Sequence, residues 1–261
     1  MGLTGAILGD IAGSRFEFWK TQFLRVGKLF HDQCRFTDDT VMSLATANAL
    51  LNSISFQQSY RELGRKHINA GYGGMFHDWL LSDNPKPYNS FGNGSAMRVS
   101  YIGEVASSVE EAVRLAEQSA SCTHNHPEGI KGAMSVAHAI YLARNGISKG
   151  KICKTICETY GYNIDSSIAE IRPTSRFDVT CQGSIPLALR CFYESQDYES
   201  CIRNAIETRC DRDTIACICG GIAESYYGNV GVDARSTLSR YLTDDLMNIW
   251  DQAMRYVNRG N

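Results

Sequence analysis

The sequence predicts an all-α protein. Long stretches repeat apolar residues at helical spacing, whereas the alternating patterns typical of strands are scarce. Asn93-Gly94 is not flanked by β-branched runs, so we expect a loop there and not a hairpin. The 261 residues are 43% hydrophobic and 21% charged, which is ordinary for a globular protein with a sizeable core.

The helices can be placed in order along the chain. Residues 41–51 are apolar or small on nearly all sides, so this helix should be buried. Further helices are expected at residues 110–120, 132–143, 187–193, 215–227 and 246–257. No Gly/Ser-rich linker, low-complexity tract or long internal repeat interrupts them, so we expect a single domain over residues 1–261.

Composition and charge exclude several classes of function. A formal net charge of −2 gives no electrostatic case for a nucleic-acid partner, although a local basic patch would escape this argument. The first residues carry no positive n-region, and no apolar stretch is long enough for a membrane span. We therefore expect a cytoplasmic protein whose ten cysteines are reduced and structural, and nothing argues against a monomer.

Two acidic clusters stand directly before apolar, nearly uncharged segments. They are Phe36-Thr37-Asp38-Asp39-Thr40 and Asp211-Arg212-Asp213-Thr214. Either cluster alone is typical of helix capping. Both helices should be buried, however, and converging carboxylates would repel each other unless cations neutralise them. Divalent cations prefer such oxygen ligands, so the pair of clusters indicates a metal site if the two meet in space.

Five ordered blocks resemble the signature of the ADP-ribosylglycohydrolase family. The first block is Gly9-Asp10-Ile11-Ala12-Gly13-Ser14-Arg15-Phe16-Glu17, and the second is the Thr37 cluster. The others are Gly92-Asn93-Gly94-Ser95-Ala96-Met97-Arg98-Val99, Thr123-His124-Asn125-His126-Pro127-Glu128-Gly129 and the Asp211 cluster. Together the blocks extend over most of the chain.

The resemblance implies a compact orthogonal bundle of helices around a central cleft that holds two Mg²⁺ or Mn²⁺ ions. It assigns the metal ligands to Thr37, Asp38, Asp39, Asp211, Asp213 and Thr214. It assigns catalytic roles to Glu17, Asp38 and Asp39, with one of these carboxylates as the base toward an attacking water. Substrate contacts are implied for Gly92, Asn93, Gly94, Ser95 and His124.

Other residues of these blocks have two interpretations each. His124 and His126 could simply stabilise the turn before Pro127, and Arg98 could be a salt-bridge partner or a phosphate contact. The adenine of a nucleotide needs an aromatic platform, for which the candidates are Tyr88, Phe91 and Phe177, each of which could equally belong to the core.

The last block departs from the family pattern. Arg209 and Cys210 stand where the family usually has two glycines, and Arg212 occupies the position between the two aspartates, usually Ser or Thr. The ligand types survive, but Arg212 could weaken a metal site if it points toward the ions, or bind a phosphate or an acidic surface if it points outward.

The resemblance implies a hydrolase that removes ADP-ribose from a modified target, with ADP-ribosyl-arginine on protein as the leading substrate. Alternative substrates are O-acetyl-ADP-ribose, ADP-ribosyl-serine and ADP-ribosylated nucleic acid. A different class of function, a weakly active module that binds ADP-ribose, is motivated by Arg209, Cys210 and Arg212.

Overall fold

The computed structural model describes residues 1–17 and 26–259, and the fold prediction is confirmed: within these ranges all regular structure is helical. The first half contains α1 (Gly2–Ser14), α2 (Asp38–Leu51), α3 (Phe56–Lys66), α4 (Gly74–Leu81), η1 (Asn93–Ser95), α5 (Ser100–Val105), α6 (Val109–Ser121) and α7 (Pro127–Arg144). The second half contains α8 (Lys149–Tyr160), α9 (Ile168–Ile171), α10 (Cys181–Glu194), α11 (Tyr198–Ile206), α12 (Arg212–Tyr227), α13 (Ala234–Leu238) and α14 (Asp244–Arg259).

All six helices expected from apolar periodicity are present, each somewhat longer than predicted. Their ends follow local capping chemistry. The Thr37 hydroxyl accepts from the Asp39 N–H at the start of α2, and the His126 side chain accepts from the Glu128 N–H before Pro127 opens α7. α12 ends at Gly228 in the left-handed conformation. The Asn93-Gly94 loop contains the 3₁₀ turn η1.

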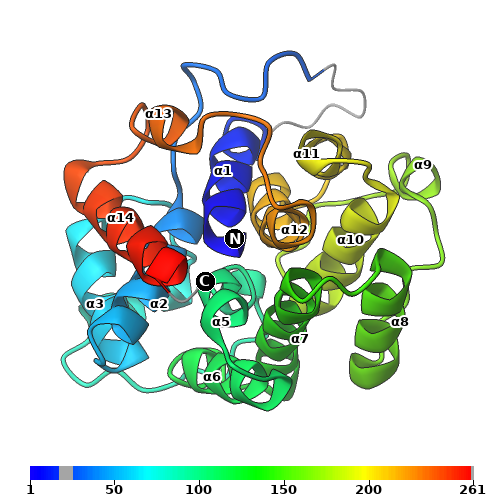
Figure 1. The fold of residues 1–261 in the computed structure, drawn as a ribbon. Helices are drawn as coiled ribbons and strands as arrows, with labels where there is room; N and C mark the ends of the chain where they lie inside the picture. The colour runs from blue at the N-terminus through cyan, green and yellow to red at the C-terminus, as the bar shows by residue number, and fades with distance from the viewer. Residues whose placement is uncertain (18–25, 260–261) are drawn as a thin grey trace.

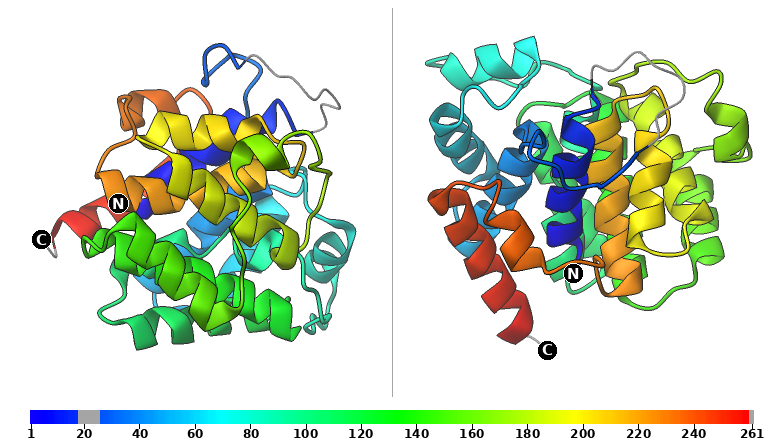
Figure 2. Two further views of the ribbon diagram at one scale, coloured as in Figure 1. Left: turned by 90° about the vertical axis from the view of Figure 1, so that its right-hand side faces the viewer. Right: turned by 90° about the horizontal axis from the view of Figure 1, so that it is seen from above.

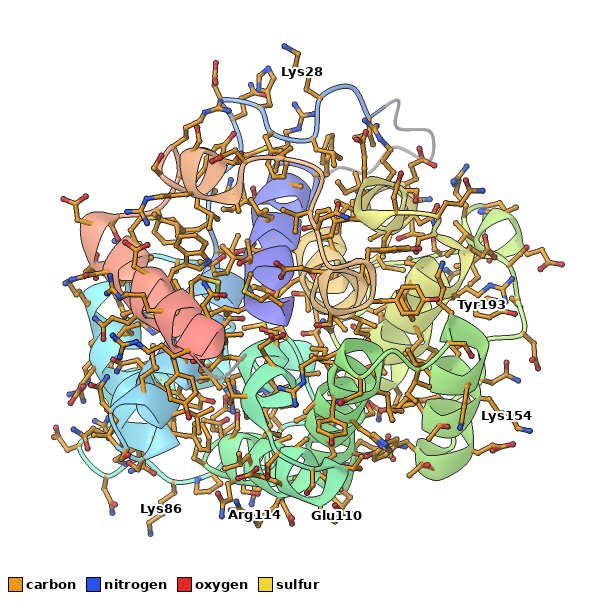
Figure 3. The ribbon with its side chains drawn as sticks, in the orientation of Figure 1. Lys28, Lys86, Glu110, Arg114, Lys154 and Tyr193 are labelled. Carbon is orange, nitrogen blue, oxygen red and sulfur yellow. The ribbon has the colours of Figure 1, made fainter. Side chains whose placement is uncertain are left out.

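Helix α1 forms the centre of the molecule, and every one of its residues is buried (Figure 1). α12 lies along one side of it, and α2, α3 and α14 lie on the other (Figure 1). α5, α6 and α7 close one end, α10 and α11 cover α12 from outside, and α8 packs against α7 and α10 (Figure 2). Charged side chains such as Lys86, Glu110 and Lys154 point away from the molecule at its edge (Figure 3).

Glycines allow α1 and α12 to approach closely as antiparallel helices. A Cβ on Gly5 would lie 2.4 Å from the Gly220 carbonyl oxygen, and one on Gly9 would lie 2.1 Å from that of Ala216. A Cβ on Gly13 would lie 2.5 Å from the Asp213 Cα. Since real side chains cannot come so near to backbone, this face of α1 accepts only glycine.

Two buried glutamates satisfy backbone donors at the start of α1. Glu104 accepts from the Gly2 N–H and Glu224 from the Gly5 N–H, both at 2.6 Å. A carboxylate is favourable at a helix N-terminus, where N–H groups lack partners. Burial nevertheless raises the pKa of Glu224 to about 8.

The expectation about the cysteines agrees with the structure: none of the ten is in a disulfide, and eight are buried. Over residues 1–17 and 26–259, none of the helices combines the length and apolar character that a membrane crossing requires.

The glycine contact yields a stability prediction. Gly9→Ala should lower the free energy of unfolding by at least about 3 kcal/mol, because backbone must move to admit the methyl group. Gly150→Ala in α8 is the control: its Cβ meets nothing within 4 Å, and alanine favours a helix by up to about 1 kcal/mol. Chemical denaturation measures both variants, and a loss below about 1 kcal/mol for Gly9→Ala would contradict the packing argument.

Candidate active site

A cavity of about 620 Å³ opens at the ends of α1, α2 and α12. Its lining combines carboxylates, the loop around Gly92 and Gly94 with His124 close by, and apolar side chains. The acidic residues in and next to the cavity are Asp10, Glu17, Asp38, Asp39, Asp211 and Asp213. The two clusters predicted from the sequence therefore meet in space.

Asp10, a fully buried carboxylate on α1, fixes the start of α2. It accepts from the backbone N–H of Thr37 at 2.9 Å, from the Thr37 hydroxyl at 2.7 Å, and from the Thr40 N–H at 3.1 Å. The Thr40 hydroxyl completes the set. Asp10 was not among the predicted site residues. The available signal was a single charge in an otherwise apolar, glycine-spaced segment.

The carboxylates form two groups that share Asp213. Asp10, Asp39 and Asp213 offer oxygen atoms that all lie within 4.8 Å of one another, and so do Glu17, Asp211 and Asp213. Pairs of metal ions that share a carboxylate recur in hydrolases. The two groups of carboxylates have the geometry to hold such a pair of ions. The predicted ligands Asp39, Asp211 and Asp213 thus lie together, joined by Asp10 and Glu17.

The other predicted ligands, Thr37, Asp38 and Thr214, lie outside the two groups of three carboxylates. Thr214 donates its hydroxyl to Asp39 Oδ2 at 3.1 Å, and Thr37 uses its hydroxyl proton on Asp10. Asp38 belongs to neither group of three, although it lines the cavity beside them. Asp39 also lines the cavity, and adjacent helical residues point about 100° apart, so Asp39 can join Asp10 and Asp213 while Asp38 does not.

The carboxylates lack the partners that would neutralise them. Asp39 Oδ1 is buried and has no hydrogen-bond partner among the described residues. Within the described part of the chain, Arg35 forms an ion pair with this cluster, and its guanidinium lies 3.8 Å from Glu17. An unmatched cluster of buried acids is costly, and divalent cations would supply the missing charge, so these residues fit such ions.

Burial and mutual repulsion raise the pKa values of this cluster. Desolvation, followed by repulsion from Asp10 and Asp211, raises the pKa of Asp38 to about 8. Desolvation and Asp211 raise the pKa of Glu17 to about 7. The pKa values of Asp39 and Asp213 lie well above the usual range for the same first cause.

The predicted substrate loop lines the wall of the cavity through Gly92, Asn93 and Gly94. The Asn93 amide donates to Asp211 at 2.8 Å and to Ser184 at 2.9 Å, which joins the loop to the acidic cluster. Ser95 is buried behind the loop and donates to the Gly129 carbonyl at 2.7 Å. His124 lies close behind the glycines: a Cβ on Gly94 would be 3.1 Å from its Nε2.

The lining of the cavity also contains aromatic and other apolar side chains. All three predicted platform candidates, Tyr88, Phe91 and Phe177, line it. The rings of Phe91 and Phe177 are 43% and 54% exposed, which excludes a core role for them. Met75 and Val179 are also exposed here, and no sequence pattern distinguished them from core residues.

Arg212 points away from the carboxylates and is almost fully buried. It donates to the carbonyls of Ile206 and Thr208 at the end of α11, and to the Phe16 carbonyl at 2.9 Å, directly before Glu17. The sequence left two directions open for Arg212, toward the metal ions or outward to a phosphate or an acidic surface. The structure shows neither, because the side chain is buried against backbone carbonyls. Cys210 is buried, and the Arg209 N–H donates to Ser175 at 2.9 Å.

The shared carboxylate predicts different metal stoichiometries for single substitutions. Asp39→Asn and Asp211→Asn each disrupt one group of three, so each should reduce two bound Mn²⁺ ions to one. Asp213→Asn disrupts both groups and should bind none tightly. Isothermal titration calorimetry counts the ions, with exposed Asp78→Asn as control and circular dichroism confirming the helices. Equal stoichiometries in all four variants would contradict this arrangement.

The raised pKa values predict how pH changes the stability of the metal-free protein. Between an ordinary aspartate value of 3.8 and about 8, the folded state holds the Asp38 proton more tightly than the unfolded state. Stability with chelator should therefore fall as pH rises from about 4 to 8, by at most about 6 kcal/mol for this group. Mg²⁺ should raise the Tm more at pH 8 than at pH 5, because fewer protons compete for the carboxylates.

A substitution elsewhere distinguishes the effect of the cavity carboxylates on stability from that of another buried acid. Glu224 has a similarly raised pKa but lies at the far end of α1. Glu224→Gln should remove part of the pH dependence and leave the Mg²⁺ effect intact. A Mg²⁺ effect that is equal at pH 5 and pH 8 in the unsubstituted protein would show that the cluster does not take up the ion.

Known proteins resemble this chain over most of its length. The family model "ADP-ribosylglycohydrolase" matches residues 1–260. The chain is 27% identical to ADP-ribosylhydrolase ARH3 of Homo sapiens over 308 positions, which cover 87% of this chain and 84% of that protein. It is 30% identical to ARH3 of Mus musculus over 183 positions, which cover 57% of this chain and half of the mouse protein.

A solved structure shares the fold. It is described as an "ADP-ribosylglycohydrolase-related protein complex" and matches with a TM-score of 0.73 at 20% identity, covering 97% of this chain and 96% of its own. The likeness of the fold and the match of the family model over nearly all residues lead to one conclusion. This chain belongs to the ADP-ribosylglycohydrolase family.

Proposed function

We propose that this enzyme hydrolyses the bond between C1″ of ADP-ribose and a modified protein, with two divalent cations, Mg²⁺ or Mn²⁺. The observation that carries the proposal is the pair of carboxylate groups sharing Asp213 in a cavity whose lining also includes exposed aromatic rings. Such a cavity suits a ligand with one polar, reactive end and one aromatic end.

The substrate would lie along the cavity from the aromatic rings to the carboxylates. Phe91 and Phe177 offer exposed ring surface for the adenine. The diphosphate would pass Gly92 and Gly94, where the absence of a Cβ permits close approach of backbone, with His124 behind them. The distal ribose would then reach Glu17 and Asp38.

Asp10, Asp39 and Asp213 would hold one cation, and Glu17, Asp211 and Asp213 the other. Bound there, the ions would supply Lewis-acid chemistry that lowers the pKa of water and holds ribose hydroxyls. Asp39 belongs to the first group and accepts a hydrogen bond from Thr214. Asp38 belongs to neither group and faces the cavity, so it is the carboxylate best placed to take a proton from water. Negative charge around C1″ would favour the oxocarbenium-like transition state.

Charge supports arginine as the modified residue. Six carboxylates exceed the four positive charges of two divalent cations, which leaves this part of the cavity acidic even with Arg35 beside Glu17. A guanidinium leaving group complements that charge better than a neutral hydroxyl does. ADP-ribosyl-serine, O-acetyl-ADP-ribose and modified nucleic acid are the competing substrates that the experiment must separate.

The test is release of ADP-ribose from a panel of arginine-, serine- and nucleic-acid-linked substrates and from O-acetyl-ADP-ribose, with Mg²⁺ and with chelator. We expect metal-dependent release, fastest from the arginine linkage. Asp38→Asn should lower kcat by at least about 100-fold with little change in ADP-ribose binding, because it removes proton transfer. If ADP-ribose is released fastest from another linkage, arginine is not the preferred modified residue.

The same experiment addresses the alternative of a weakly active binding module. ADP-ribose binding without release from any substrate, at every metal concentration, would favour the module and reject the hydrolase. The placement of Arg212 speaks for the hydrolase, because this side chain leaves the carboxylates free.

A further inference from the structure

Arg98 is a buried cation without a carboxylate partner among the described residues. Its side chain is fully buried at the wall of the cavity, between η1 and α5. One terminal nitrogen donates to the Ser119 carbonyl at 2.6 Å and to the Thr123 hydroxyl oxygen at 2.9 Å. The guanidinium lies 4.3 Å from the centre of the Tyr60 ring. A buried charge held only by dipoles and a ring calls for an explanation beyond packing.

The Thr123 hydroxyl forms hydrogen bonds with both Arg98 and His124. Its oxygen accepts from Arg98, so its single proton is available for one other partner. The nearest acceptor is His124 Nδ1 at 2.8 Å, whereas the Ala120 carbonyl lies at 3.4 Å. If Nδ1 carried a proton and donated it to Thr123, the Thr123 proton would have only the long contact to Ala120. The arrangement in which Thr123 donates to an unprotonated Nδ1 therefore gives the better hydrogen bonds.

This bond leaves the His124 proton on the opposite ring nitrogen. Nε2 faces the loop, 3.1 Å and 3.6 Å from the positions that a Cβ would take on Gly94 and Gly92. Burial and the charge of Arg98 lower the pKa of His124 well below its usual value. The other group facing the ring is Tyr88, with ring centres 5.6 Å apart, and it brings no negative charge that would restore the imidazolium.

We propose that Arg98 and Thr123 are positioning residues that hold His124 as a neutral Nε2–H donor to a substrate oxygen at the Gly92–Gly94 loop. The role toward substrate rests on the proposed function, whereas the tautomer does not. An Nε2 that carries a proton has no lone pair for a metal ion. The arrangement therefore gives the wall of the cavity a hydrogen-bond donor and keeps His124 from competing for the cations.

Nuclear magnetic resonance tests the tautomer without substrate or metal. Long-range ¹H–¹⁵N spectra of ¹⁵N-labelled protein show which ring nitrogen carries the proton, and His124→Asn assigns the signal among the six histidines. We expect a neutral His124 with an unprotonated Nδ1 from pH 6 to 8. Thr123→Ser should keep this signature, and the isosteric Thr123→Val should change it.

Thr46→Val is the matched control, since this buried hydroxyl bonds the Tyr60 hydroxyl and should leave the His124 signal unchanged. A proton on Nδ1 in the unsubstituted protein would overturn the proposal. So would an unaltered signature in Thr123→Val.

Binding measurements test the contact with substrate. His124→Asn and Thr123→Val should weaken ADP-ribose binding by about 5- to 10-fold, as expected for one lost hydrogen bond, while Thr123→Ser restores it. Equal weakening of ADP, which lacks the distal ribose, would identify a phosphate oxygen as the acceptor. Weakening confined to ADP-ribose would identify a ribose hydroxyl. Unchanged binding of both ligands would reject the contact.

The two proposals can fail separately. If no linkage is hydrolysed but the spectra and the binding agree with expectation, the positioning role stands and the hydrolase proposal falls. If release occurs but His124 carries its proton on Nδ1, the positioning role falls alone.

Discussion

The close approach of α1 and α12 determines where the chemistry can occur. Gly5, Gly9 and Gly13 let backbone meet backbone, since a Cβ at any of them would lie within 2.5 Å of α12. Asp10 and Asp213 can therefore share one group of carboxylates although they belong to different helices. A wider spacing would separate the two acidic clusters, and neither alone offers three carboxylate oxygens from different directions. The glycine face is thus as necessary to the site as the carboxylates are.

The two ends of α1 show how the same residue type can stabilise or strain a fold. At its start, Glu104 and Glu224 accept from backbone N–H groups that would otherwise lack partners. Near its other end, Asp10 is satisfied by hydrogen bonds, but it adds to the repulsion on Asp38 and Asp39. The starts of α2 and α12 offset part of that repulsion through the helix dipole. The remainder is what divalent cations would relieve, so stability and metal binding are coupled here.

The sequence was sufficient for what depends on local pattern. Apolar periodicity predicted the main helices, and the paired aspartates before two of them predicted the acidic cluster. The sequence was insufficient where the role of a residue depends on the direction of its side chain. Asp38 and Asp39 look equivalent in sequence and both line the cavity, yet only Asp39 joins a group of three carboxylates. Asp10 was missed because its role depends on the distance between two helices, and the short helices without strong periodicity could not be placed.

Arg212 shows how a departure from a family pattern can be compatible with the site. Two glycines before an Asp-x-Asp motif would leave the backbone free to turn, whereas this chain has Arg209 and Cys210 there. The guanidinium of Arg212 instead ties the end of α11 to the Phe16 carbonyl, directly before Glu17. A cation at the last carbonyls of a helix is favourable, and the same contact restrains the turn that carries Glu17. The substitution thus places a second positive charge behind the cluster without occupying it, much as Arg98 does behind His124.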